Sequence, residues 1–287
     1  MSVMMKRILT IVVTYNGIGW VDRCLGSVEG DVFVVDNGSH DGTPEYIKTH
    51  YPSVILHCTG ENYGFGKANN IGFAYALAQG YDYVYLLNQD AWVFPDTFPA
   101  LVAAMEANPE YGVLSPVQVT ASLERPDPRF AVKCLKKPVD DYESGKIYDV
   151  PFVMAAHWMI SRRCLETVGG FSPAFRHYGE DDNYLHRALF HGFKVGFLAG
   201  TCAVHDRELR PMSKKASMRL KCVASVVKVS NPQNCLCWRL FIQPFELLAI
   251  SILRLSADVL RFIPGFVASY PRLVRLRRRS MSSGAFL

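Results

Sequence analysis

The sequence predicts an α/β fold in which a mostly parallel central sheet is flanked by helices and followed by a C-terminal helical segment. Strand-like and helix-like stretches alternate from residue 8 to residue 107. The strand-like stretches are continuous apolar runs, which is typical of strands buried on both faces. With 49% hydrophobic and 20% charged residues, the chain of 287 residues is globular and large enough for one α/β domain with an appendage.

The elements of the first half follow one another in a regular order. Predicted strands cover 8–14, 32–35, 54–57 and 83–87, and predicted helices cover 19–28, 41–50, 67–79 and 98–107. Strands separated by helices of this length predict parallel pairing through right-handed crossovers. In such sheets a ligand binds beyond the carboxyl ends of the strands, near a switch in strand order.

The second half is less regular. Residues 115–150 contain prolines that interrupt any long element, at positions 116, 126, 128 and 138. An apolar run from Val153 to Ile160 and a helix over 162–168 follow. A further helix begins at the acidic triplet Glu180-Asp181-Asp182. The helix dipole by itself favours acids there, but three adjacent carboxylates repel one another, so one is expected to have a raised pKa.

Polar side chains follow each of the first four predicted strands. The sets are Thr14-Tyr15-Asn16, Asp36-Asn37-Gly38-Ser39, residues 61–67, and Asn88-Gln89-Asp90. Any one of these sets is common in loops, since Asn and Asp favour turns and helix starts. Four such sets at one edge of one sheet form a site, so the sequence predicts a functional role for Asp90.

The positive charge of the chain is concentrated at its C-terminal end. No acidic residue follows Asp258, and the net charge of +5 is accounted for by the arginines at 261, 272, 275, 277, 278 and 279. This argues against a nucleic-acid groove across the main domain and for an anionic surface contacted by the C-terminus. The eight cysteines are scattered, and no signal-peptide pattern precedes the first strand. We therefore expect reduced thiols and a cytoplasmic protein.

Seven segments occur in the order seen in glycosyltransferase family 2. They are TIVVTYNG, VFVVDNGSHDGT, ENYGFGKANNIG, YLLNQDAWV, MISRRCLETVGGF, YGEDDNYLHRA and AVHD. Over residues 9–205 the sequence resembles the rhamnosyltransferase-like members of that family. The resemblance implies the GT-A fold and the transfer of a sugar, with inversion, from a nucleoside diphosphate donor to a hydroxyl group.

The resemblance also implies a divalent cation, Mg²⁺ or Mn²⁺. Family members hold it with a strand-end Asp-x-Asp motif, which here reads Asn88-Gln89-Asp90. Asp90 then binds the metal, and Asn88 contacts the ribose or phosphate of the donor. His205 matches a second metal ligand of the family, with Asp206 as an alternative, although a His at a strand end is more often structural. With one carboxylate instead of two, the diphosphate must supply further ligands.

Roles for the remaining site residues follow from the same resemblance. Asp181 matches the base that takes the proton of the acceptor hydroxyl, beside Glu180 as a second catalytic candidate; the family's later Asp is here Asn183. Acceptor-side residues are His157, Trp158 and Asp182, although Trp158 fits a core position equally well. Donor-side residues are Thr14, Asn16, Asp36, Asn37, Gly64, Gly66 and Lys67. An acid like Asp36 pairs with the N–H of uracil or thymine, which implies a UDP or dTDP donor.

The family pattern ends near Cys235, so we expect a GT-A domain over residues 1–234 and an amphipathic, basic helical segment over 235–287. The longest uncharged stretch of this segment is far below the ~18–20 residues of a membrane span. Glu246, Arg254, Asp258 and Arg261 are predicted on one face of a helix. The wide apolar remainder either packs on the catalytic body or lies in a membrane interface, which the arginines favour.

The sequence therefore predicts an inverting, metal-dependent glycosyltransferase at the cytoplasmic face of the cell membrane, acting on a polysaccharide or lipid-linked glycan. A nucleotidyltransferase of related sheet topology would need a Gly-rich loop with Arg and Lys after the first strand, where this chain has Thr14-Tyr15-Asn16-Gly17. A non-catalytic sugar-nucleotide binder would not need both Asp90 and Asp181. A Rossmann dehydrogenase is excluded because no Gly-x-Gly-x-x-Gly follows the first strand.

Overall fold

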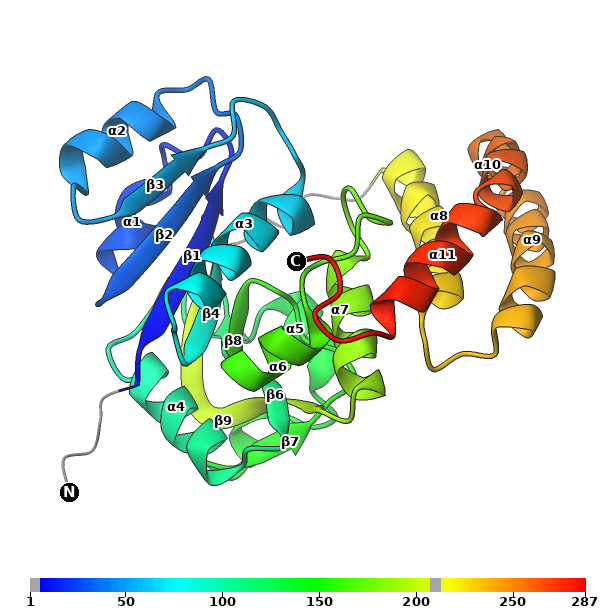
Figure 1. The fold of residues 1–287 in the computed structure, drawn as a ribbon. Coiled ribbons are helices and arrows are strands. Elements are labelled where there is room, and N and C mark those ends of the chain that lie inside the picture. The colour runs from blue at the N-terminus through cyan, green and yellow to red at the C-terminus, as the bar shows by residue number, and fades with distance from the viewer. Residues whose placement is uncertain (1–5, 207–212) are drawn as a thin grey trace.

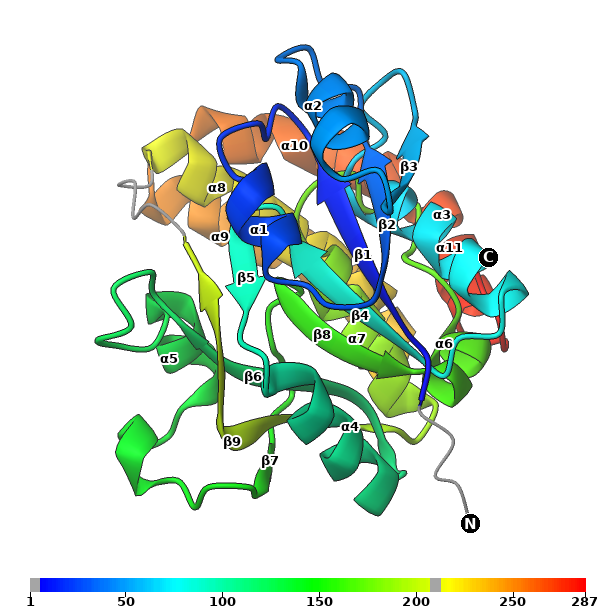
Figure 2. The same cartoon turned by 90° about the vertical axis from the view of Figure 1, so that its left-hand side faces the viewer.

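A computed structural model describes residues 6–206 and 213–287. In this part of the chain a mixed β-sheet carries helices on both faces, and a group of helices lies to one side of it (Figures 1 and 2). The strands are β1 (Ile8–Thr14), β2 (Asp31–Asp36), β3 (Ile55–Cys58), β4 (Tyr83–Asn88), β5 (Ala91–Val93), β6 (Tyr111–Val119), β7 (Ile147–Asp149), β8 (His157–Ser161) and β9 (Lys194–His205).

The helices fall into two groups, those on the sheet and those beside it. The first group is α1 (Val21–Gly26), α2 (Thr43–His50), α3 (Phe65–Ala78), α4 (Thr97–Ala107), α5 (Pro128–Cys134), the short 3₁₀ turn η1 (Val139–Asp141), α6 (Arg162–Val168) and α7 (Glu180–Phe190). The second group is α8 (Lys214–Ser230), α9 (Leu236–Leu253), α10 (Ala257–Ala268) and α11 (Tyr270–Ser280).

The order of the strands is β3-β2-β1-β4-β8-β6-β9-β5, with β7 paired to β9. As expected, β3, β2, β1 and β4 are parallel. Their register places Thr14 beside Asp36 and Val13 beside Asn88. The carboxyl ends of these strands therefore meet at one edge of the sheet, which confirms the predicted α/β arrangement around the strand-end residues.

The other half of the sheet is mixed rather than parallel. β8 is antiparallel to both β4 and β6, and β5 and β7 are antiparallel to β9. Antiparallel pairing needs no crossover helix, and the proline-containing stretch before β8 contains only the short helix α5 and the turn η1. β6 runs through Pro116, where its pairing with β9 shifts register.

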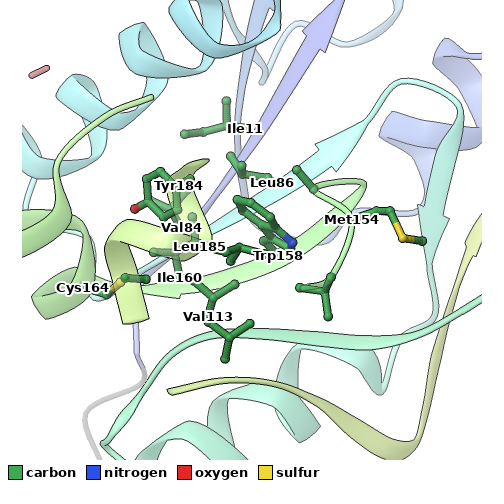
Figure 3. Close-up of a cluster of buried hydrophobic side chains, with 14 of the residues drawn as sticks. Ile11, Val84, Leu86, Val113, Met154, Trp158, Ile160, Cys164, Tyr184 and Leu185 are labelled. Carbon is green, nitrogen blue, oxygen red and sulfur yellow. The ribbon is translucent and has the colours of Figure 1, made fainter. Parts of the chain in front are cut away.

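The two faces of the sheet carry separate cores. Helices α3, α6 and α7 cover one face, and α1, α2 and α4 cover the other. Figure 3 shows the centre of the first core, where Trp158 of β8 and Tyr184 of α7 lie among aliphatic side chains of β1, β4 and β6. Phe171 packs against both, with its ring 6.2 Å from that of Trp158 and 5.1 Å from that of Tyr184, and these two rings are 5.7 Å from each other. This packing fixes α7, and with it the acidic triplet, against the sheet.

A third core joins the helices beside the sheet. It includes Met218 and Cys222 of α8, Leu247 of α9, Phe266 of α10 and Leu273 of α11. Helix α8 therefore packs with the segment that was predicted to begin at residue 235. The predicted single charged face is wrong, because the chain turns at Leu255, whose φ is +48°, and α9 and α10 are separate helices.

Helix α9 is the one candidate for a membrane span among the described residues. It is long and apolar enough by length and composition, with a mean hydropathy of 1.5, and 17% of it is buried. It also contains Arg239, Glu246 and an internal Pro244. One such helix is weak evidence for a span, and the sequence prediction differed because it considered only uncharged stretches.

Candidate functional site

The residues at the ends of β1 and β2 form a buried hydrogen-bond network. Thr14, Asp36 and Asn37 are each at most 3% exposed. Thr14 Oγ1 donates to Asp36 Oδ2 at 3.0 Å, and the amide of Ser39 donates to Asp36 Oδ1 at 3.0 Å. The Asp36 carboxylate is thus fixed at the strand edge by its own loop.

Two further side chains hold the loop after β1. Asn16, with φ +47°, accepts a hydrogen bond from the amide of His40 at 2.9 Å through Oδ1. Gln89 Oε1 accepts from the amide of Tyr15 at 2.8 Å, and Gln89 Nε2 donates to the Tyr15 carbonyl at 3.3 Å. Sequence reasoning treated Gln89 only as the spacer of its motif, and the structure shows that it joins the ends of β1 and β4.

The glycine loop before α3 packs against protein. Gly64 has φ +81°, and a Cβ on it would lie 2.3 Å from the carbonyl oxygen of Arg176. A Cβ on Gly66 would lie 2.8 Å from Cβ of Phe171. Close contact with the 171–176 segment is therefore sufficient to require glycine at both positions. Lys67 is exposed, with Nζ 3.4 Å above the ring centre of Tyr63.

Beyond the end of β4, the imidazole of His205 lies between the carboxylates of Asp90 and Asp127. Pairing of β5 with β9 places Ala91 beside His205, and Asp90 Oδ1 lies 3.7 Å from His205 Nε2. On the other side of the ring, His205 Nδ1 lies 3.8 Å from Asp127 Oδ2. Asp127 Oδ1 caps α5 by accepting from the amides of Arg129 and Phe130. Asp127 was missed, although Pro126-Asp127-Pro128 is a helix-start signal.

The side chains at this position fit a divalent cation that receives additional ligands from a diphosphate. Within the described ranges no three His, Cys, Asp or Glu side chains are grouped as a complete metal site. The Asp90 carboxylate is 32% exposed and faces the imidazole of His205. One carboxylate and one imidazole are too few for a hard cation by themselves, but they match a metal held jointly with phosphate oxygens.

A cavity of about 660 Å³ joins this edge of the sheet to α7. Asn88 and His205 line one side of it, and Glu180, Asp181 and Asp182 line another. Further lining residues come from α5, α8 and the loop before β8. The amide of Ala155 in that loop donates to Asp181 Oδ2 at 3.5 Å. The structure therefore brings the acidic triplet together with Asn88 and His205 in one cavity, whereas Asp90 and the residues at the ends of β1 and β2 do not line it.

The acidic triplet is electrostatically strained, as the crowding of three acids predicts. Burial and then the neighbouring Asp181 raise the pKa of Glu180 from 4.5 to about 7. Burial also raises the pKa of Asp182. Oε2 of Glu180 has no hydrogen-bond partner among the described residues. A neutral Glu180 lowers the cost of keeping Asp181 ionised next to it.

The raised pKa predicts how stability depends on pH. The folded protein binds the Glu180 proton more tightly than the unfolded chain does. The protonated Glu180 therefore adds to the free energy of unfolding. This contribution is fully present below pH 4.5 and is lost as the pH rises to about 7. We expect Glu180→Gln to remove it, as measured by urea unfolding across this range. Glu124→Gln, at an exposed position, is the matched control, and an unchanged pH profile in Glu180→Gln would contradict the assignment.

The structure does not bring His157 and Trp158 to the cavity. Both are fully buried. His157 is hydrogen-bonded to the Tyr85 hydroxyl at 2.8 Å and to the Val204 carbonyl at 2.9 Å, and Trp158 packs in the core of Figure 3. Because side chains alternate along a strand, His157 and Trp158 of β8 point to opposite faces of the sheet. Ala155 and Ala156, which precede the strand, line the cavity.

Comparison with known proteins gives a consistent family match. The family model of glycosyl transferase family 2 matches residues 10–169. The chain is 38% identical over 108 residues to undecaprenyl-phosphate mannosyltransferase of Micrococcus luteus, which covers 34% of this chain and 44% of that protein. It is 33% identical over 128 residues to N-acetylglucosaminyl-diphospho-decaprenol L-rhamnosyltransferase of Mycobacterium tuberculosis, covering 39% and 42%. The chain spans less than half the length of these relatives.

Solved structures agree on the fold. Residues 1–349 of TarS from S. aureus, in complex with UDP-GlcNAc, align with a TM-score of 0.60 at 15% identity, over 96% of this chain and 88% of that chain. The mannosyltransferase PcManGT from Pyrobaculum calidifontis, in complex with GDP-Man and Mn²⁺, aligns with a TM-score of 0.56 at 16% identity, over 97% and 88%. The predicted GT-A fold is confirmed.

Proposed function

The chain belongs to glycosyltransferase family 2, and we propose that it moves a sugar, with inversion, from a UDP or dTDP donor to a hydroxyl of a lipid-linked or polysaccharide acceptor. The cavity supports this proposal best, because Asn88 and His205 line it together with the acidic triplet of α7. A transferase needs both a donor phosphate site and a base in one space, and the two sets lie here on different elements.

On the donor side, the chain positions the nucleoside and the diphosphate separately. We assign the nucleoside to the edge formed by Thr14, Asp36 and Asn37, and the phosphates to the space beside Asn88 and Asp90. Asp90 and His205 would hold Mg²⁺ or Mn²⁺, which would neutralise charge on the leaving diphosphate. Asp127 orients the His205 ring through the contact at its second nitrogen.

On the acceptor side, Asp181 is the proposed base. A carboxylate within hydrogen-bond reach takes the proton of the acceptor hydroxyl as that oxygen attacks the anomeric carbon. The amide of Ala155 holds Oδ2 of Asp181 toward the cavity. Inversion follows if this attack occurs on the face opposite the leaving diphosphate in a single displacement.

The names of similar proteins support the proposed classes of donor and acceptor. Two curated relatives are named for polyprenyl-linked substrates, which supports a lipid-linked acceptor. The structures aligned with this chain include complexes with UDP-GlcNAc and with GDP-Man and Mn²⁺, which supports a nucleoside diphosphate donor and a divalent cation.

A nucleotide binding screen tests the proposed function. We expect UDP or dTDP, together with Mn²⁺, to raise the melting temperature, because a ligand at about 100 times its Kd stabilises the folded state by about 2.7 kcal/mol. GDP is the control for the base preference that Asp36 implies. The absence of a shift with every nucleoside diphosphate would contradict a donor site, and binding without transfer of sugar would favour the non-catalytic alternative.

We further propose that the protein works at the inner face of a membrane, held there by an apolar stripe on α9. The stripe is Trp238, Phe241, Phe245, Leu248 and Ile252, which are 40–64% exposed. These positions recur on one side of the helix, while Leu247 on the other side is buried against the neighbouring helices. Helix α9 thus docks on the body with one face and leaves the other face for an interface.

Four of the five arginines of α11 divide into two groups, and the fifth, Arg279, lies over the ring of Phe286 at 5.4 Å. Arg277 donates to the carbonyls of Asn231, Pro232 and Asn234, and Arg272 donates to the carbonyl of Pro173. Arg272 and Arg277 therefore connect α11 to other segments of the protein. Arg275 and Arg278 are exposed and supply the attraction to anionic lipid that salt should weaken.

Vesicle co-sedimentation tests the membrane proposal. We expect Phe241→Ser with Phe245→Ser to release the protein from anionic vesicles at low and high salt, because the apolar anchor is lost. Arg275→Gln with Arg278→Gln should weaken binding only at low salt. Val132→Ser removes an apolar side chain that is 84% exposed on α5 and should change nothing. Equal sedimentation of all variants would contradict the stripe as an anchor.

A further inference from the structure

Helix α8 presents a second apolar face to the cavity. Leu220, Val223, Ala224 and Val227 all line the cavity. Their spacing places them on one face of the helix. The other face, with Met218 and Cys222, packs in the core of the neighbouring helices. Val227 is buried and packs, with Val223, beside Gly179. Leu220 and Ala224 are the part of this face that remains for a ligand to cover.

Helix α5 contributes cations to the lining of the cavity. Arg129 and Lys133 of α5 are four residues apart, line the cavity and are exposed. Neither forms a salt bridge with any described residue, although Lys133 Nζ lies 5.7 Å from the ring centre of Phe152. Lys228, which also lines the cavity, is paired with Glu246 at 2.5 Å. Arg129 and Lys133 therefore place positive charge on the cavity lining, and Lys133 also acts electrostatically on Asp182, where it opposes the effect of burial on the pKa of that carboxyl.

The donor does not account for both features. The proposed nucleoside residues Thr14 and Asp36 do not line the cavity, whereas Asn88 and His205 form its border on that side. Lys133 of α5 acts electrostatically on Asp182, and Val223 and Val227 of α8 lie beside Gly179, the residue before the acidic triplet. Both features therefore extend to the triplet, on the proposed acceptor side. A ligand that matches both must combine a hydrocarbon part with an anionic group.

We infer that the cavity binds an acceptor whose sugar is joined through phosphate to a lipid, with the phosphate at Arg129 and Lys133 and the first part of the hydrocarbon chain along the α8 face. This rests on the proposed function. The acceptor hydroxyl then lies toward Asp181, between the two recognition elements. Phosphate and guanidinium or ammonium groups form strong charge-assisted hydrogen bonds, while the α8 face distinguishes a lipid from a soluble sugar phosphate.

Binding of farnesyl diphosphate to the full chain tests the inference. Titration calorimetry is run with UDP or dTDP and Mn²⁺ already saturating the donor site, so that the probe reports the remaining space. We expect Arg129→Gln with Lys133→Gln to weaken binding of farnesyl diphosphate by about tenfold or more, as expected for losing charged hydrogen bonds. Lys136→Gln with Lys137→Gln, on exposed neighbours that do not line the cavity, should leave the affinity unchanged.

The apolar face has its own matched pair of variants. Ala224→Gln places a neutral polar group on the cavity face of α8, and we expect it to weaken binding of farnesyl diphosphate but not of inorganic diphosphate. Ala216→Gln introduces the same group at an exposed position of α8 outside the cavity and should have no effect. Equal effects of the two substitutions would overturn the role of the α8 face.

The remaining outcomes separate this inference from the proposed function. Equal affinity of wild type and the α5 double variant for farnesyl diphosphate overturns the inference, as does a wild type that does not bind the probe. Loss of UDP or dTDP affinity in the double variant also overturns it, because the cations would then serve the donor. If no nucleoside diphosphate binds the wild type, the proposed function itself fails.

Discussion

Replacing Asp181 by Asn is expected to lower kcat by about 10³-fold, within the usual contribution of a general base. The side chain keeps its shape and its contact with the amide of Ala155, but it can no longer accept the acceptor proton. Because Asp181 lies with the acceptor-side lining of the cavity, donor affinity should be unchanged. Single-turnover transfer and nucleotide binding, measured on the same preparation, separate the two effects.

Asp182→Asn is the matched control for the base. Asp182 lies on the same turn of α7 and also lines the cavity, but it is assigned to the acceptor side and not to the proton transfer. We expect a smaller loss of kcat in this variant than in Asp181→Asn. Near-normal turnover of Asp181→Asn would transfer the role of the base to Glu180 or Asp182.

Replacing Asp90 by Ala is expected to abolish the metal dependence of donor binding. The Asp90 side chain is 32% exposed and its carboxylate faces His205. Without this carboxylate the cation would keep only the imidazole and the phosphates as ligands. The diphosphate charge is then poorly compensated. We expect the affinity for UDP or dTDP with Mn²⁺ to fall to its value without metal, as measured by titration calorimetry in the presence and absence of EDTA.

Asp206→Ala distinguishes the two acidic candidates for the metal. Asp206 lies next to His205 and forms a salt bridge with Arg23 at 3.6 Å, so its carboxylate already has a cationic partner. Metal-dependent binding should survive in this variant. If Asp206→Ala loses metal dependence and Asp90→Ala retains it, the ligand assignment must be exchanged.

Local patterns predicted the elements of the catalytic body well. The helix expected over 162–168 is α6, and the strand ending in Asn88 is β4. Such elements follow from apolar period, strand length and capping within a few residues. The same alternation predicted that the polar ends of β1, β2 and β4 would meet, because parallel strands place their carboxyl ends at one edge.

Long-range contacts decided what local patterns could not. Asp127 caps α5 by a local signal, but its contact with His205 depends on how β9 and the proline-rich stretch pack together. No local pattern predicted that Gly64 lies against the carbonyl of Arg176, and its role in donor binding stays a prediction. His157 and Trp158 precede a helix in the sequence, yet pairing of β8 with β4 buries both.

The sequence by itself determined the α/β class, the family, and most candidate residues for the proposed chemistry, because each can be recognised in short contiguous segments of the chain. The tertiary structure alone decided which of those side chains share a cavity, since that depends on contacts between residues far apart in the chain. It also showed that α8 turns one apolar face to the helical core and another to the cavity. A helix with two apolar faces has the same sequence pattern as a buried helix, and only the packing around it shows which face is left for a ligand.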